Sequence, residues 1–211
     1  MASRIGLFGG SFNPVHCGHL IAARSAAEAL AWERVIFLPS GHPPHKDTGG
    51  LLEASHRSAM VRLAIKDEPL FEFDDFDLRE SGPTYTLDAV THFADALGSG
   101  TSLSWLIGSD TLIELASWHR ISTLVEVCRI VTAVRPGWEA PDLTLLRSVL
   151  SERQIDGLRD NIVETPRIDI SSTDIRDRIA GGLSVRCLVP DAVRAYIDDH
   201  RLYQGSGSRV G

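Results

Sequence analysis

The sequence has few cysteines, and their number and spacing exclude two kinds of protein. Only Cys17, Cys128 and Cys187 are present. An odd number of widely spaced cysteines cannot make a disulfide framework, and without a Cys-x-x-Cys pair there is no zinc signature. We expect the three cysteines to be reduced thiols in a cytoplasmic protein.

The chain also lacks an excess of positive charge. It contains 21 lysines and arginines against 28 aspartates and glutamates, which gives a formal net charge of -7. Such a protein has no general attraction for nucleic acid or for an anionic membrane, and we expect neither as a partner. A polyphosphate ligand would have to be held by a few placed cations and a divalent metal.

Long apolar runs and one familiar glycine signature are missing as well. The N-terminal apolar stretch is too short for a signal peptide, and no segment has the length of a transmembrane helix, so we expect a cytoplasmic location. The Gly-x-Gly-x-x-Gly motif is absent, which argues against a dinucleotide-binding oxidoreductase. No repeat or linker divides the 211 residues. We predict one domain over residues 1–204, followed by a flexible tail at 205–211.

Short apolar segments alternate with amphipathic ones through the first two thirds of the chain. The predicted strands are Arg4–Phe8, Arg34–Pro39, Phe71–Asp77, Ser102–Ile107 and Arg129–Val134. Between them, helical spacing places apolar side chains on one face, as for Leu20, Ala23, Ala27 and Leu30, and for Leu87, Val90, Ala94 and Leu97. This alternation predicts an α/β fold, a Rossmann-like, doubly wound parallel sheet that binds its ligand at the carboxyl ends of the strands.

The last third is predicted to be a small helical part, at about residues 142–204. Its predicted helices are Leu143–Leu158, Ser172–Ala180 and Asp191–His200. Pro190 is suited to the first turn of the last helix.

A glycine-rich run follows the first predicted strand. It reads Gly-Gly-Ser-Phe-Asn-Pro over residues 9–14 and ends in His16 and His19, three residues apart at the mouth of a helix. Glycines let the backbone turn sharply and bring its N–H groups close to a ligand, and a helix N-terminus favours negative charge. The run predicts a phosphate cradle, although a histidine pair on a loop is also compatible with a metal site or a plain surface.

A second candidate anion site lies at residues 170–176, which read Ile-Ser-Ser-Thr-Asp-Ile-Arg. Ser171 and Asp174 approximate a capping box at the start of a helix. An ordinary capped helix with a solvated Arg176 explains the segment equally well. The functional interpretation combines helix amides, hydroxyl donors and one guanidinium into a second phosphate site.

Both segments resemble motifs of one family. The first resembles the His-x-Gly-His motif of nucleotidyltransferases related to class I aminoacyl-tRNA synthetases, in the form typical of bacterial nicotinate mononucleotide adenylyltransferases. The second matches the Ile-Ser-Ser-Thr-x-Ile-Arg motif of that family position by position. The resemblance extends over nearly the whole chain, including Pro43-Pro44-His45-Lys46, Gly108-Ser109-Asp110 and Arg135-Pro136-Gly137.

The resemblance implies a set of functional residues. It implies catalytic roles for His16, His19, Lys46 and Arg176. It implies ATP contacts for Gly9, Gly10, Ser11, Phe12, Gly18, Gly108, Asp110, Ser171, Ser172 and Thr173. It implies contacts to nicotinate mononucleotide for Tyr85, Thr86, Trp118, His119 and Arg135, whereas Ile121 stands where many members have a second tryptophan. Cys17 stands where the family commonly has tyrosine, which implies that it fills space rather than acting as a nucleophile.

The implied reaction is adenylyl transfer from ATP to nicotinate mononucleotide, with release of pyrophosphate. Mg²⁺ would arrive on the ATP phosphates, since the sequence offers no carboxylate cage for it and no protein metal site is predicted. Trp118 is suited to stack on a pyridine ring, and amides near Tyr85, Thr86 and His119 to donate to a carboxylate. These residues belong to Gly82-Pro83-Thr84-Tyr85-Thr86 and Ser117-Trp118-His119, which resemble the family's two loops for the pyridine nucleotide. Neither loop contains an aspartate or a glutamate, which favours the acid over the amide substrate.

Three alternatives stay open at this stage. A sibling transferase, such as pantetheine-phosphate adenylyltransferase or a cytidylyltransferase, shares the first motif. An enzyme with dual use of the acid and the amide mononucleotide differs only in its acceptor. A non-catalytic nucleotide sensor would bind ATP or NAD without releasing pyrophosphate. The sequence is also compatible with a homo-oligomer.

Overall fold

The computed structural model describes residues 3–41, 51–80, 82, 84–134, 138 and 141–204. Within them, six strands pair in parallel in the order β3-β2-β1-β4-β5-β6. The strands are β1 Ser3–Gly10, β2 Arg34–Pro39, β3 Phe71–Phe73, β4 Thr101–Gly108, β5 Arg129–Val134 and β6 Ile162–Glu164. The α-helices are α1 Cys17–Leu30, α2 Ala54–Ile65, α3 Phe76–Arg79, α4 Thr86–Leu97, α5 Ser109–Leu112, α6 Ile121–Val127, α7 Glu152–Asp160, α8 Ser172–Ala180 and α9 Asp191–Asp199. Two 3₁₀ helices are η2 Ile113–Ser117 and η3 Leu143–Ser148.

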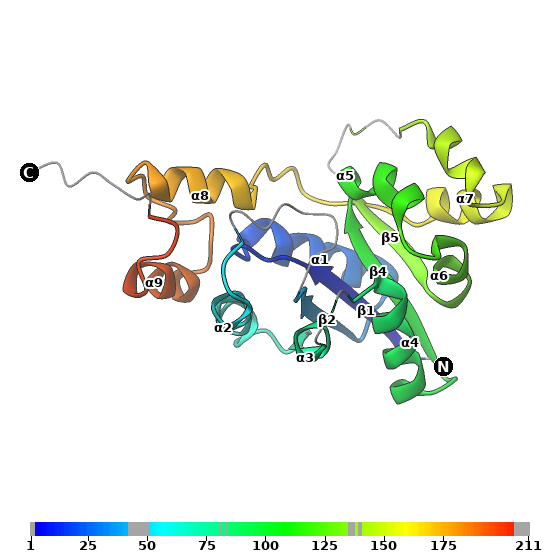
Figure 1. Cartoon of the computed structure of the whole chain (residues 1–211), viewed down its shortest axis with the longest axis horizontal. Coiled ribbons are helices and arrows are strands. Elements are labelled where there is room, and N and C mark those ends of the chain that lie inside the picture. The colour runs from blue at the N-terminus through cyan, green and yellow to red at the C-terminus, as the bar shows by residue number, and fades with distance from the viewer. Residues whose placement is uncertain are drawn as a thin grey trace, which may run out of the picture.

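Helices cover both faces of this sheet, which confirms the predicted doubly wound α/β fold (Figure 1). Alternate residues of each central strand enter different cores, because successive side chains of a strand point to opposite faces. In β4, Trp105 packs with α4, η2 and α6, whereas Leu106 packs on the α1 side. The predicted apolar faces of α1 and α4 enter these two cores. No helix in the described residues is long and apolar enough to cross a membrane.

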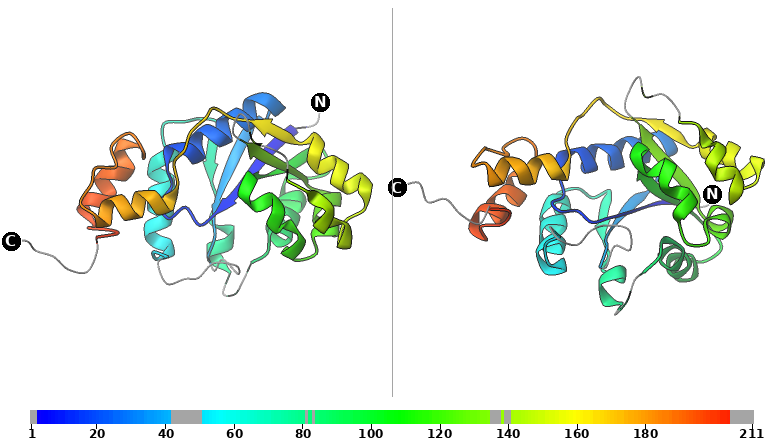
Figure 2. Two further views of the ribbon diagram at one scale, coloured as in Figure 1. Left: turned by 90° about the horizontal axis from the view of Figure 1, so that it is seen from above. Right: turned by 45° about the horizontal axis from the view of Figure 1, so that its top comes forward.

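The last third of the chain is mostly helical, as the sequence predicts, but its helices lie at two different places on the sheet (Figure 2). Helices α8 and α9 stand beside α2 at one end of the molecule, and α7 lies at the opposite end (Figure 2). Between them β6 joins the edge of the sheet, a strand that the sequence analysis missed. The helix predicted for α8 is confirmed, and α9 ends one residue earlier than predicted. The single-domain boundary at residue 204 stays a prediction.

Two predicted elements are wrong in extent, for local reasons. The helix predicted over Leu143–Leu158 is broken into η3 and α7, because Ser151 starts a new helix in a capping box with Gln154. The strand predicted over Phe71–Asp77 ends at Phe73. The carboxylate of Asp74 accepts a hydrogen bond from the N–H of Phe76 at 2.7 Å, which turns the chain into α3.

Gly6 permits a close contact within the sheet. A Cβ atom at this position would lie 2.3 Å from Cε3 of Trp32, a buried ring in the core on the α1 side. We expect Gly6→Ala to lower the free energy of unfolding by about 1–3 kcal/mol, because the ring must move in a packed core. Urea denaturation measures the loss. Gly157→Ala is the control, since α7 has open space there and alanine favours helix. Equal midpoints for Gly6→Ala and wild type would contradict the prediction.

The strand order also places the site. Chain connections run outward in opposite directions from β1 and β4, so the carboxyl ends of these two strands flank the point at which the winding reverses. In open α/β sheets the crevice at this point is where ligands bind. The glycine-rich run begins in the last two residues of β1, and Gly108-Ser109-Asp110 begins with the last residue of β4.

Candidate active site

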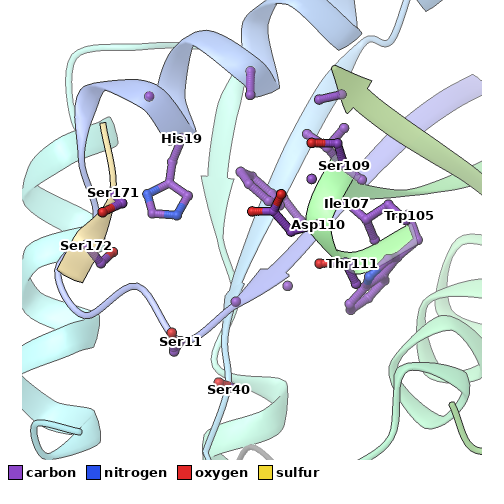
Figure 3. A pocket seen from close by; sticks show the side chains of 18 of the residues that line it. Ser11, His19, Ser40, Trp105, Ile107, Ser109, Asp110, Thr111, Ser171 and Ser172 are labelled. Atoms are coloured by element: carbon purple, nitrogen blue, oxygen red, sulfur yellow. The ribbon is translucent and has the colours of Figure 1, made fainter. Parts of the chain in front are cut away.

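A cavity of about 630 Å³ occupies this position, and most of the predicted site residues line it (Figure 3). Figure 3 shows His19, Ser171 and Ser172 on one side of the cavity and Ser109, Asp110 and Thr111 on the other. The lining includes Gly9, Gly10, Ser11, His16, Gly18, His19, Tyr85, Thr86, Gly108, Asp110, Trp118, His119, Ser171, Ser172 and Thr173. The two sequence motifs, distant along the chain, therefore meet at one cavity.

The N-termini of two helices open into this cavity. Gly18 and His19 belong to the first turn of α1, and residues 171–173 begin α8. Hydrogen bonds join the two motifs: Ser172 Oγ donates to the carbonyl of Pro14 at 2.8 Å, and Arg176 Nη1 donates to the carbonyl of Asn13 at 2.9 Å. Among the described lining residues there is no lysine or arginine. An anion here would meet helix amides, hydroxyl groups and imidazoles.

His16 and His19 hold each other in a reciprocal capping arrangement. Nδ1 of His16 accepts from the N–H of His19 at 3.3 Å, and Nδ1 of His19 accepts from the N–H of His16 at 3.2 Å. The two rings stack with their centroids 3.7 Å apart. Because both Nδ1 atoms accept hydrogen bonds, we assign the proton of each neutral ring to Nε2. Both imidazoles are thereby set as Nε2–H donors.

Burial fixes the charge state of His16. The side chain is only 6% exposed, and burial lowers its pKa to about 4. His16 is therefore neutral at pH 7, where its ring offers an Nε2–H donor rather than a positive charge.

Two predicted residues do not line the cavity. Phe12, predicted to contact ATP, is 1% exposed, and its ring packs against those of Phe8 and Phe37 and makes a T-shaped contact with His19. It supports the cradle from the core. The guanidinium of Arg176 is tied to the Asn13 carbonyl and to Thr173 Oγ1, which places it behind the rim of the cavity.

Arg57, which the sequence analysis did not single out, lies behind the cradle. It is 1% exposed, and three backbone carbonyls accept its hydrogen bonds: Leu52 from Nε at 2.9 Å, Ser11 from Nη1 at 2.9 Å and Gly41 from Nη2 at 3.5 Å. Burial lowers the pKa of Arg57, but a guanidinium stays charged in proteins. Among the described residues no carboxylate pairs with it.

Aromatic side chains gather at the other end of the cavity, where it borders α4 and η2 on the opposite face of the sheet from α1. The rings of Tyr85 and His119 stack with their centroids 4.3 Å apart, and Trp118 lies partly buried against the core. The N–H of Tyr85 donates to the carboxylate of Asp88 at 3.0 Å, so this amide is not available to a substrate carboxylate as the sequence analysis expected. The amide of Thr86 begins α4, where helix N–H groups have no acceptor within the helix. Ile121, at the place of a second tryptophan, is buried in the core.

Several acidic and hydroxyl groups that the sequence analysis missed also line the cavity. Asp77 and Glu114 join Asp110 on its wall, so the absence of carboxylates from the two loops does not make this region free of them. Ser40 and Thr84 line it too. Ser40 directly follows β2, and this place at the carboxyl end of a strand was the one signal that could have found it.

The remaining candidates fall into three groups. Lys46 and Arg135 lie outside the described residues. Asp110 sits in the first turn of α5 rather than at its N-cap, which is Gly108. Burial raises the pKa of the Cys17 thiol, which makes it a poor nucleophile. Over the described residues, no group of three or more His, Cys, Asp and Glu side chains is placed to hold a metal ion.

Comparison with known proteins gives consistent relatives over nearly the whole length. Residues 7–178 match the model of the cytidylyltransferase-like family. A protein from Dehalococcoides mccartyi strain CBDB1, named a probable nicotinate-nucleotide adenylyltransferase, is 38% identical over 202 residues, which is 95% of this chain and 97% of that protein. A protein of the same name from Symbiobacterium thermophilum is 40% identical over 203 residues, or 95% of each chain.

The fold has solved counterparts as well. The structure of Plasmodium falciparum nicotinic acid mononucleotide adenylyltransferase complexed with NaAD superposes with a TM-score of 0.74 over 95% of this chain and 97% of that one. Its sequence identity is 18%, so this likeness supports the fold. By sequence over nearly its full length, the chain belongs to the cytidylyltransferase-like family and, within it, to the nicotinate-nucleotide adenylyltransferases.

Proposed function

We propose that this adenylyltransferase of NAD biosynthesis joins ATP to nicotinate mononucleotide in the cavity between β1 and β4, giving deamido-NAD and pyrophosphate. One observation carries the assignment to this cavity. The donors of the stacked His16–His19 pair and the N-termini of α1 and α8 meet at one end, and Trp118 with the Tyr85–His119 stack stands at the other. A polyphosphate and a pyridine ring require these two kinds of surface.

The chemistry needs positioning more than it needs a base. The 5′-phosphate of the acceptor is already a competent nucleophile near neutral pH. It attacks the α-phosphorus of ATP in line with the departing pyrophosphate, which takes the electrons of the broken P–O bond. Charge then grows on the phosphate oxygens of the transition state, and fixed donors stabilise it. His16 and His19 supply Nε2–H donors whose rings are already oriented by their mutual capping bonds.

The other parts of the nucleotide site follow from the same arrangement. Ser171, Ser172 and Thr173 at the start of α8 would bind the β- and γ-phosphates, with Arg176 and Lys46 adding positive charge. Asp110, across the cavity from His19, would accept from the ATP ribose (Figure 3). The described residues form no carboxylate cage, so we propose that Mg²⁺ enters on the ATP phosphates.

The acceptor would lie with its ring at the aromatic end. Trp118 would stack on the pyridine ring, and the Thr86 amide at the start of α4 would donate to the ring carboxylate, with His119 beside it. Arg135 would complete this part of the site. A cytoplasmic location, a single domain and self-association of the chain stay proposals, as does the absence of nucleic-acid and membrane partners, for which the net charge is the support.

Pyrophosphate release tests the function directly. The enzyme is incubated with ATP and Mg²⁺ and with nicotinate mononucleotide, nicotinamide mononucleotide or phosphopantetheine in parallel. We expect strong release with the acid mononucleotide and little with the other two. Comparable rates with the acid and the amide would keep the reaction but refute the acceptor assignment. Nucleotide binding without release in any arm would instead support a sensor.

A further inference from the structure

Three buried side-chain oxygens, on residues that line the cavity, have no hydrogen-bond partner among the described residues. They are Ser40 Oγ, Asp77 Oδ1 and Thr84 Oγ1, and all three residues line the same cavity. Buried polar atoms are nearly always paired, and each exception calls for an explanation. A group of three in one cavity indicates a polar ligand that supplies the missing hydrogen bonds.

Contacts and chain neighbours link these residues to both ends of the site. The N–H of Ser40 donates to the carbonyl of Gly10 in the cradle at 2.9 Å. Next to Ser40, Gly41 approaches Asp77 so closely that a Cβ atom on it would lie 2.5 Å from the Asp77 carbonyl. Thr84 adjoins Tyr85, whose ring stacks on His119. The cavity wall therefore connects the phosphate cradle to these three polar residues, and these residues to the aromatic end. A mononucleotide has the same order of phosphate, ribose and ring.

The chemistry of Asp77 selects one part of such a ligand. A carboxylate accepts hydrogen bonds and repels the phosphate and the ring carboxylate of nicotinate mononucleotide. In ionised nicotinate mononucleotide, the two ribose hydroxyls are the only O–H or N–H groups. They are therefore the only groups of this substrate that can donate a hydrogen bond to Asp77. Burial raises the pKa of Asp77 to about 7, with Asp88, Asp74 and Glu80 adding repulsion, so the protein leaves this carboxyl without compensation for its charge. A hydroxyl donor would supply that compensation.

We propose that Asp77, flanked by Ser40 and Thr84, binds the ribose 2′- and 3′-hydroxyl groups of the acceptor mononucleotide. The inference rests on the proposed function, because it takes the acceptor from that reaction. It adds a specificity-determining residue that separates a ribonucleotide acceptor from its deoxy forms.

The test combines a variant with an altered substrate. Pyrophosphate release is measured for the wild-type enzyme and Asp77→Ala with nicotinate mononucleotide and with its 2′-deoxy and 3′-deoxy forms. For wild type we expect kcat/KM to fall about 10- to 100-fold with at least one deoxy form, the range for a hydrogen bond to a charged group. Asp77→Ala should lose a similar factor on the normal acceptor, mainly through KM for that substrate, with KM for ATP unchanged. The kcat/KM of Asp77→Ala on the deoxy form should then be less than about 3-fold below its value on the normal acceptor.

Control variants separate this role from a structural one. Asp75→Ala removes a carboxylate from the N-cap of the same helix, where it pairs with Arg79 away from the cavity, and should leave the ribose preference unchanged. Asp77→Asn keeps an acceptor oxygen and should retain part of the preference for the normal acceptor over its deoxy forms. This variant also tests the proposal if Asp77→Ala does not fold.

The outcomes distinguish the two levels of proposal. Equal losses of Asp77→Ala on normal and deoxy acceptors would overturn the ribose assignment while leaving the reaction intact. So would a wild-type enzyme indifferent to both deoxy forms, or a variant that changes the preference between acid and amide instead. Absence of release by wild type with the normal acceptor would refute the proposed function itself.

Discussion

The variant His19→Ala is expected to turn over about 100- to 1,000-fold more slowly than wild type while keeping its fold. The loss is the range found when one fixed donor is removed from a site where charge grows in the transition state. His19 lines the cavity at the first turn of α1, and its ring is oriented by the bond from the N–H of His16. The measurement is kcat from pyrophosphate release, together with a thermal unfolding curve.

Two further variants make this result specific. His19→Asn retains a side-chain oxygen in reach of the His16 N–H, so it preserves the cap but removes the Nε2–H donor, and it should be nearly as slow as the alanine variant. His200→Ala removes an exposed histidine at the C-cap of α9 that does not line the cavity and should leave kcat unchanged. Near-normal turnover of His19→Asn would mean that His19 only caps the helix.

The predicted fold agrees with the structure where the signal is periodic. β2 and β5 have the predicted bounds, because a short run of buried apolar residues between polar neighbours is a clear strand pattern. The alternation of such runs with amphipathic segments was enough to predict a parallel, doubly wound sheet. Topology then placed the cavity, since winding reverses at one point of the sheet.

The misses occur where a few atoms decide the structure. β6 has three residues, too few for a period to register, and it exists because β5 offers it an edge. Ser151 and Gln154 form a cap inside a segment whose apolar spacing otherwise looks continuously helical. Neither effect is visible in hydrophobic patterning, because one depends on tertiary pairing and the other on two side-chain hydrogen bonds.

The candidate site shows the same difference between features that are local in sequence and features that depend on the fold. Its motifs at residues 9–19 and 170–176 are local in sequence, so their chemistry could be read before their position was known. Asp77 and Arg57 belong to no such motif. Asp77 looks like one of several surface carboxylates, and only the cavity shows that one of its oxygens is buried and without a partner among the described residues. Arg57 resembles a charged residue of an exposed helix, yet it faces inward.

The bonds of Arg57 have a consequence for the cradle. A trans peptide is planar, so its C=O and N–H point in opposite directions. Since Arg57 holds the carbonyl of Ser11, the N–H of Phe12 points away from the guanidinium, and Phe12 itself adopts a left-handed backbone with φ of 45°. The same guanidinium holds the carbonyls of Gly41 and Leu52. One buried cation therefore fixes peptide orientation at the cradle and beside Ser40.

Replacing Arg57 with methionine is accordingly expected to lower the free energy of unfolding by about 3 kcal/mol, because three carbonyls lose a buried donor. At temperatures where the variant is folded, kcat should still fall about 10- to 100-fold, since a displacement of about 1 Å in a positioned site has an effect of this size. Urea denaturation and pyrophosphate release measure the two effects. Arg57→Lys should recover part of the stability but little of kcat, because an ammonium lacks the planar fork that reaches three carbonyls. Arg62→Met removes a charge from the exposed face of the same helix and is the matched control. If Arg57→Met lost stability but kept wild-type kcat, Arg57 would be a structural tie between loops and would not position the cradle.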